Sequence, residues 1–100
     1  MPLQWSRFPI VVRDLALLFG ADVPVQAIMD AIGARKPAIV QSVRLLSLYR
    51  GTGVPSGSKS LAFRVVMQDT AKTLTDEEAD AAMAQLTDLL SAKFGARLRT

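Results

Sequence analysis

The feature that most constrains the fold is the segment of residues 44–66, RLLSLYRGTGVPSGSKSLAFRVV, in which a glycine-rich stretch joins two apolar runs. Such runs, bounded by glycine and proline, predict strands, and a short glycine-containing connection predicts a hairpin between them. The single tyrosine of the chain, Tyr49, ends the first run beside Arg50, and Lys59 and Ser60 begin the second. An aromatic ring and positive charges are therefore expected together at one end of a β-hairpin.

Four strand patterns are present along the chain. In the second one the alternation of apolar residues slips, which predicts a bulge near Leu45, and beyond it Ser47 and Tyr49 share the face opposite to Leu48. In the third, Leu61, Phe63, Val65 and Met67 form one apolar row. The residues left on its other face are Ser60, Ala62, Arg64, Val66 and Gln68. The predicted strands cover residues 8–19, 38–49, 59–68 and 96–99.

Two helices are predicted between these strands. Asp22 is expected to cap the first, and Gly33 is expected to end it. Thr75 and Glu78 have the spacing of a capping box, so a second helix is predicted to start there, and Gly95 is a natural left-handed stop.

The order strand, helix, strand, strand, helix, strand predicts an α+β fold, a ferredoxin-like βαββαβ sandwich. In it, two helices cover one face of a four-stranded antiparallel sheet, and the other face stays open. The predicted domain spans residues 8–100, with residues 1–7 as an N-terminal extension or the stub of a linker.

Composition limits the chemistry that this chain can perform. It has no cysteine and no histidine, which removes thiolate chemistry, the commonest general base and the commonest transition-metal ligand. Residues 1–72 carry nine Lys and Arg against four Asp, a balance that suits a phosphate-rich partner. No apolar run reaches the roughly 18 residues of a membrane span, and no signal peptide is recognisable, so a cytoplasmic protein without a membrane partner is expected.

Residues on the open face are the candidate binding residues. Tyr49 could stack on a nucleobase while arginines hold phosphates; the alternative is a strand-end tyrosine that packs on the next loop within a solvated charged face. Arg13 and Asp14 are consecutive in a strand, so one of them is expected near the core or in need of a partner, and Asp14 could fix a loop or Arg13. The residues expected on the open face are Arg44, Ser47, Tyr49, Ser60, Ala62 and Arg64. The candidate binding residues of the whole chain are Arg13, Arg44, Ser47, Tyr49, Arg50, Lys59, Ser60 and Arg64.

Other motifs do not support catalysis or a metal site. GTGVPSGSKS lacks the adjacent GK and the following helix of a phosphate-binding loop. KSLAFRVV only weakly matches the RNA-recognition motif. An acylphosphatase would need an asparagine, and the chain has none. The acidic residues at 76–80 suit a helix N-terminus.

Taken together, SRFPIVVRDLALLF, SVRLLSLYRG, SGSKSLAFRVVMQD and KTLTDEEADAAMAQL occur in an order and at separations that closely resemble the ferredoxin-fold anticodon-binding domain of bacterial phenylalanyl-tRNA synthetase beta subunits. The resemblance covers residues 6–99. The chain departs from the family pattern at Ser47, where an aspartate is usual, which puts a carboxylate contact there in doubt.

The resemblance implies that the domain binds the anticodon stem-loop of phenylalanine tRNA, with Tyr49 stacking on the first anticodon base and Ser60 adding a polar contact. The parent enzyme would use ATP and Mg²⁺ and contain the rest of the beta subunit and an alpha subunit in an (alpha-beta)₂ assembly. The fragment itself is expected to have no cofactor and no catalytic residue. The alternative from a different class is a free-standing ferredoxin-like domain that binds a small molecule or dimerises.

Overall fold

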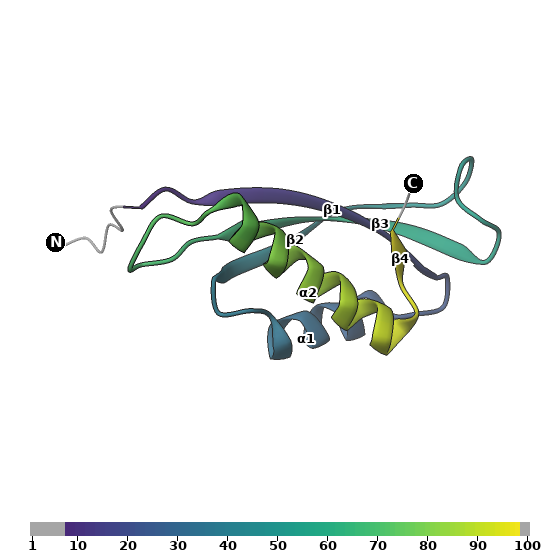
Figure 1. Cartoon of the computed structure of the whole chain (residues 1–100). Coiled ribbons are helices and arrows are strands. Elements are labelled where there is room, and N and C mark those ends of the chain that lie inside the picture. The colour runs from purple at the N-terminus through teal and green to yellow at the C-terminus, as the bar shows by residue number, and fades with distance from the viewer. Residues whose placement is uncertain (1–7, 99–100) are drawn as a thin grey trace, which may run out of the picture.

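The computed structural model describes residues 8–98 and has the predicted element order. A four-stranded antiparallel sheet has the order β2-β3-β1-β4, and two helices lie together on one of its faces (Figure 1). The elements are β1 (Val11–Gly20), α1 (Val25–Arg35), β2 (Val40–Tyr49), β3 (Ser58–Met67), α2 (Asp76–Phe94) and β4 (Arg97–Leu98). The prediction of a ferredoxin-like α+β sandwich is confirmed.

The core lies between the helices and the covered face of the sheet. The predicted apolar row of β3 is buried there, and Ile28 and Ile32 of α1 and Leu86 and Leu90 of α2 pack against it. Phe19 of β1 contacts two further aromatic rings edge to face, with ring centroids 6.4 and 6.3 Å away; these rings are Phe63 and Phe94. Burial of these large side chains provides most of the driving force for folding.

The second helix begins and ends as predicted. The Thr75 side chain accepts a hydrogen bond from the Glu78 backbone N–H, and the Glu78 carboxylate accepts one from the Thr75 N–H, which completes the capping box. At the other end Gly95 has a left-handed conformation with φ 70°. Both signals are local in sequence, which is why they could be recognised without the fold.

The limits of the first helix were predicted incorrectly. Pro24, not Asp22, occupies the N-cap, and no side chain caps the helix. The helix also continues through Gly33 to Arg35. It ends there because Lys36 precedes Pro37 and has an extended conformation, which is what a residue before proline prefers.

The strands follow the predicted pattern with small differences. β1 starts at Val11, three residues later than predicted, and β4 contains two described residues, since Arg99 lies outside the described part of the chain. The predicted bulge is confirmed as a register shift between Leu45 and Ser47, and a second shift precedes Ser42. Residues 1–7, predicted to be a linker stub, lie outside the described residues.

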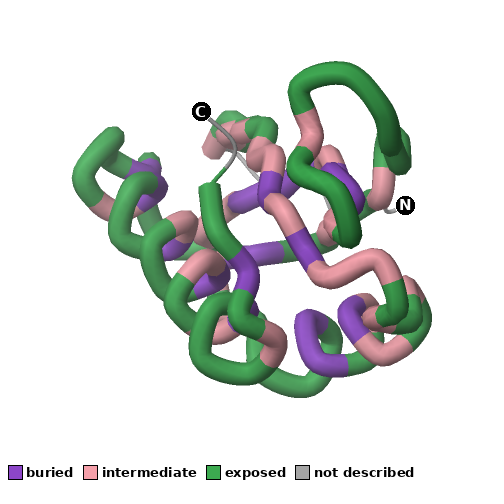
Figure 2. Tube along the Cα trace, turned by 90° about the vertical axis from the view of Figure 1, so that its right-hand side faces the viewer, coloured by how far each residue is buried: buried purple, intermediate pink, exposed green. Residues whose placement is uncertain are grey.

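The β2–β3 loop projects beyond the ends of the helices (Figure 1). Figure 2, which views the molecule from that end, shows the loop as exposed over most of its length. Three of its glycines, Gly51, Gly53 and Gly57, have positive φ. The end of the sheet that carries Tyr49 therefore stands clear of the helix layer.

Candidate nucleic-acid interface

The face of the sheet opposite to the helices is called the open face below. Residues paired across antiparallel strands point to the same side of a sheet, so the strand registers arrange the open face in rows. One row crosses the whole sheet and contains Tyr49, Ser60, Leu18 and Arg97. The next rows are Ser47–Ala62–Ala16, then Arg44–Arg64–Asp14, then Ser42–Val66–Val12.

Tyr49 ends β2 on the open face, as predicted, and 41% of its surface is exposed. Its hydroxyl donates a hydrogen bond of 3.0 Å to the backbone carbonyl of Thr52. Gly51 has φ 126°, and a Cβ added there would lie 3.4 Å from the Tyr49 hydroxyl oxygen. The ring is thus held against its own loop, in the arrangement that the alternative interpretation described, and it still presents surface to solvent.

Ser60 is the partner of Tyr49 in the adjacent strand, also as predicted. Its position in an inner strand leaves it only 3% exposed, with Tyr49 on one side and Leu18 on the other. A ligand can contact its hydroxyl only after a neighbouring side chain moves. Strand alternation predicts the face on which a side chain lies but not how far it is exposed, so the burial of Ser60 could not be predicted from the sequence.

Lys59 does not accompany Tyr49, and this corrects one predicted placement. It has the same parity as Leu61 and therefore points to the covered face, where it is 4% exposed and its Nζ donates to the backbone carbonyl of Val23. The ammonium group is satisfied inside the domain and is not available to a phosphate on the open face.

Arg13 is also on the covered face, paired in register with Val65. Its Nη2 lies 3.3 Å from Oδ1 of Asp76 at the start of α2. Arg13 therefore lies on the opposite side of the sheet from Tyr49, as Lys59 does. In both cases strand alternation, counted from the apolar row, already predicts that the side chain points to the covered face.

Asp14, adjacent to Arg13, points to the open face and pairs with Arg64, a partner that the sequence analysis did not consider. Arg64 Nε lies 3.0 Å from Asp14 Oδ1, and Nη2 lies 3.1 Å from Oδ2. The hydrogen bonds from Arg64 lower the pKa of the Asp14 carboxyl below its usual value, and the Asp14 carboxylate raises the pKa of the Arg64 guanidinium. The charge of Arg64 is therefore compensated within the domain.

Three other arginines on or beside the open face make no ion pair with any of residues 8–98. Arg44 lies in β2 opposite Arg64, Arg50 follows Tyr49, and Arg97 pairs in register with Leu18. All three are exposed. Arg97 was not among the residues predicted from the sequence; its face follows from the register of β4 with β1. Ser47, exposed and paired with Ala62, is on the open face as predicted.

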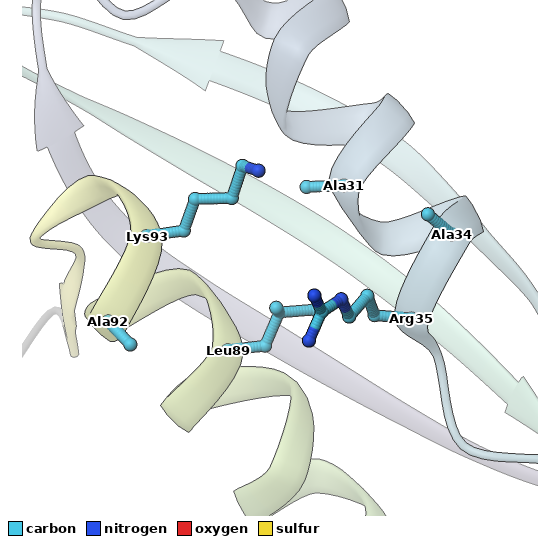
Figure 3. Close-up of a pocket in the computed structure, with 6 residues that line it drawn as sticks. All are labelled: Ala31, Ala34, Arg35, Leu89, Ala92 and Lys93. Carbon is cyan, nitrogen blue, oxygen red and sulfur yellow. The ribbon is translucent and has the colours of Figure 1, made fainter.

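A cavity of about 310 Å³ lies in the helix layer, away from Tyr49. It is open between α1 and α2, and Arg35 and Lys93 extend into the space between these helices (Figure 3). Among residues 8–98 there is no cluster of acidic side chains that could hold a metal ion. Within the same range, neither helix has the length and hydropathy needed to cross a membrane.

Comparisons with known proteins agree with this geometry. The family model described as ferredoxin-fold anticodon binding domain matches residues 6–99. The chain is 48% identical over 95 residues to the phenylalanine–tRNA ligase beta subunit of Nitrosospira multiformis, and 47% identical over 94 residues to that of Dechloromonas aromatica. The subunit from Methylococcus capsulatus is 43% identical over 94 residues. These matches cover 94–95% of the chain but only 12% of the length of each relative.

Proposed function

The chain belongs to the ferredoxin-fold anticodon-binding domain family, and we propose that its open face binds the anticodon loop of phenylalanine tRNA. The observation that carries the proposal is the position of Tyr49 at the end of the open face, partly exposed, beside Ser60 and near uncompensated arginines. An RNA loop offers unstacked bases and phosphates, and this surface offers an aromatic ring and positive charges.

Stacking on Tyr49 is the first proposed contact. An aromatic side chain contributes roughly 1 to 3 kcal/mol per stacked base. The hydrogen bond between the Tyr49 hydroxyl and the Thr52 carbonyl supports this role because it limits the rotation of the ring before a base arrives. A ring that is already oriented loses less conformational entropy on binding.

Phosphate contacts by arginine are the second proposed contribution. Arg44, Arg50 and Arg97 are exposed and have no ion-pair partner in residues 8–98, so a phosphate does not have to compete with a carboxylate for them. Lys59 and Arg13 are left out of this set because both point to the covered face. Each phosphate contact to a single strand should add about 0.7 to the salt dependence of binding.

A full-length subunit would place this domain in a larger enzyme, since the chain spans 12% of the length of its relatives. We propose that the domain orients tRNA in the cytoplasm for an aminoacylation reaction performed elsewhere in the parent enzyme. The remaining beta subunit and an alpha subunit would be the protein partners there, and ATP and Mg²⁺ would be used at that distant site.

The test is titration of the 100-residue chain with a phenylalanine-tRNA anticodon stem-loop, with Tyr49→Ala compared with Leu48→Ala. Leu48 is the adjacent residue of β2, is similarly exposed at 44%, and points to the other face. Because a stacked base is worth roughly 1 to 3 kcal/mol, Tyr49→Ala should weaken binding by about fivefold or more, with little change in salt dependence. Leu48→Ala should bind like the parent chain.

Equal losses of RNA affinity for Tyr49→Ala and Leu48→Ala would contradict the proposal, because the two faces of the sheet would then contribute equally to RNA binding. Saturable binding of a small molecule, or concentration-dependent dimerisation blocked by Tyr49→Ala in the absence of RNA binding, would favour the alternative function. Isolated domains of multidomain enzymes bind with modest affinity, so the titration should extend to high micromolar RNA.

A further inference from the structure

The Asp14–Arg64 ion pair occupies the centre of the open face. β1 and β3 are the two inner strands of the sheet, and the pair joins them directly in register. Two hydrogen bonds of 3.0 and 3.1 Å hold the guanidinium group against the carboxylate. The side chains are nevertheless 47% and 56% exposed, so both remain accessible from solvent.

The Asp14–Arg64 pair contributes only a small amount to the stability of the sheet, although opposite charges in register favour strand pairing. Exposed ion pairs contribute little to folding, because water screens the attraction and two side chains lose freedom. Arg44 lies directly opposite Arg64, and like charges opposite one another disfavour strand pairing. The row therefore contains two guanidinium groups and one carboxylate, which points toward recognition of a ligand.

The chemistry of the pair suits a base edge better than a phosphate. Arg64 uses Nε and Nη2 for Asp14, so its Nη1 hydrogens remain available as donors, and the carboxylate oxygens retain capacity as acceptors. A phosphate presents only acceptors and is attracted by uncompensated charge, which Arg64 lacks. A nucleobase edge presents donors and acceptors side by side, as this pair does.

The open face has room for a base beside the pair. The row between Tyr49 and Arg64 consists of the small residues Ser47, Ala62 and Ala16. Ser60 and Arg64 are four positions apart in β3, a distance of about 13 Å. Stacked bases are spaced about 3.4 Å apart, so the pair would contact a different nucleotide from the one on Tyr49.

Building on the proposed function, we propose that Asp14 and Arg64 form a base-reading pair that selects a second nucleotide of the bound RNA loop. Asp14 acts in two ways. It fixes the orientation of the Arg64 guanidinium group, and it removes the net charge that would otherwise attract any phosphate. Arg44, at the outer end of the same row, is left to hold the phosphate backbone.

The experiment measures binding of the 100-residue chain to stem-loops in which each loop position is replaced in turn by the other three bases. Asp14→Asn and Arg64→Gln are compared with the parent chain, and Glu78→Gln, which disrupts an exposed ion pair with Lys72 at α2, is the matched control. Circular dichroism verifies that every variant is folded.

With the parent chain, one loop position other than that governed by Tyr49 should show about tenfold discrimination among bases. Both Asp14→Asn and Arg64→Gln should reduce this ratio to nearly one. Asp14→Asn should also bind all loops in a more salt-dependent way, with a slope steeper by about 0.7, because Arg64 then becomes an uncompensated cation. Glu78→Gln should change neither quantity.

Unchanged discrimination in both folded variants would overturn the inference, as would absence of any second discriminating position in the parent chain. A lower salt slope for Arg64→Gln with unchanged discrimination would identify Arg64 as a phosphate contact and would also overturn it. The proposed function has a separate test: it fails if Tyr49→Ala and Leu48→Ala weaken RNA binding equally.

Discussion

On the covered face of the sheet, Arg13 pairs with Asp76 and Lys59 donates to the Val23 carbonyl, whereas on the open face Arg44 has no ion pair with any of residues 8–98. The reason lies in the solvent. Lys59 is 4% exposed, so its ammonium group loses hydration and needs a partner inside the protein, whereas a charge on an uncovered surface keeps its water. On the open face, Asp14 compensates the charge of Arg64, and the charge of Arg44 is available to a ligand.

The same contrast holds for adjacent residues of β3. Phe63 is 1% exposed and lies in the core, while Ala62 points to the open face and remains partly accessible. A single strand therefore has two different roles, and substitutions on its two sides should separate folding from binding.

The largest effect is expected for Phe63→Ala, which should lower the free energy of unfolding by about 3 to 5 kcal/mol because it leaves a cavity beside Phe19. Urea denaturation followed by circular dichroism measures this loss. Ala62→Ser, one residue away on the open face, is the control and should change stability little. A loss below about 1 kcal/mol for Phe63→Ala would mean that the covered face is not the core.

A smaller effect should distinguish cations on the two sides of the molecule. Arg44→Met should reduce the salt slope of stem-loop binding by about 0.7, because one phosphate contact is lost. Arg35→Met removes the same charge from the helix layer, where the cavity of Figure 3 opens, and should leave the slope unchanged. Equal reductions would show that net charge, not the open face, controls RNA binding.

The smallest effect is expected for the Glu78 carboxylate, whose charge contributes to folding and not to RNA binding. Hydrogen bonds from Lys72 and from the Thr75 backbone lower the pKa of the Glu78 carboxyl. Its ionised form therefore stabilises the folded state above the unfolded pKa near 4.5, and this contribution is lost as the pH falls through the lower folded pKa. Glu78→Gln should melt a few degrees below the parent chain at pH 6.

As the pH falls from 6 to 3, the difference in melting temperature between Glu78→Gln and the parent chain should shrink, because the glutamate becomes protonated in the folded state as well. Thermal melts followed by circular dichroism at the two pH values give the comparison, and stem-loop binding at pH 6 should be the same for both proteins. A difference that persists undiminished at pH 3 would mean that the glutamate acts through its shape and not through its charge.

Much of this architecture could be predicted because its signals are local. The capping box of α2, the left-handed Gly95 and the bulge after Leu45 each depend on a few consecutive residues. The side of the sheet on which Tyr49 and Ser60 lie followed from alternation once the bulge was placed. Applied to Lys59, the same alternation places its side chain on the covered face, the side to which Leu61 points.

Other features were decided by a neighbouring residue or strand that competed with the predicted signal. Asp22 looked like a helix cap, but Pro24 takes that position, and Gly33 looked like a stop, but the helix ends before Pro37. Ser60 was expected to be accessible, and burial between two strands makes it nearly inaccessible. In each case the competing residue or strand decided the result.

The sequence alone determined the number, type and order of the elements, because hydrophobic periodicity, caps and turns act over a few residues. Which charges meet depends on the folded chain: Arg64 pairs with Asp14, 50 residues away in the sequence, and Arg13 pairs with Asp76, 63 residues away. Such partners depend on the register between strands and on the position of a helix over the sheet. Both are set by the packing of the whole core, so no short segment specifies them.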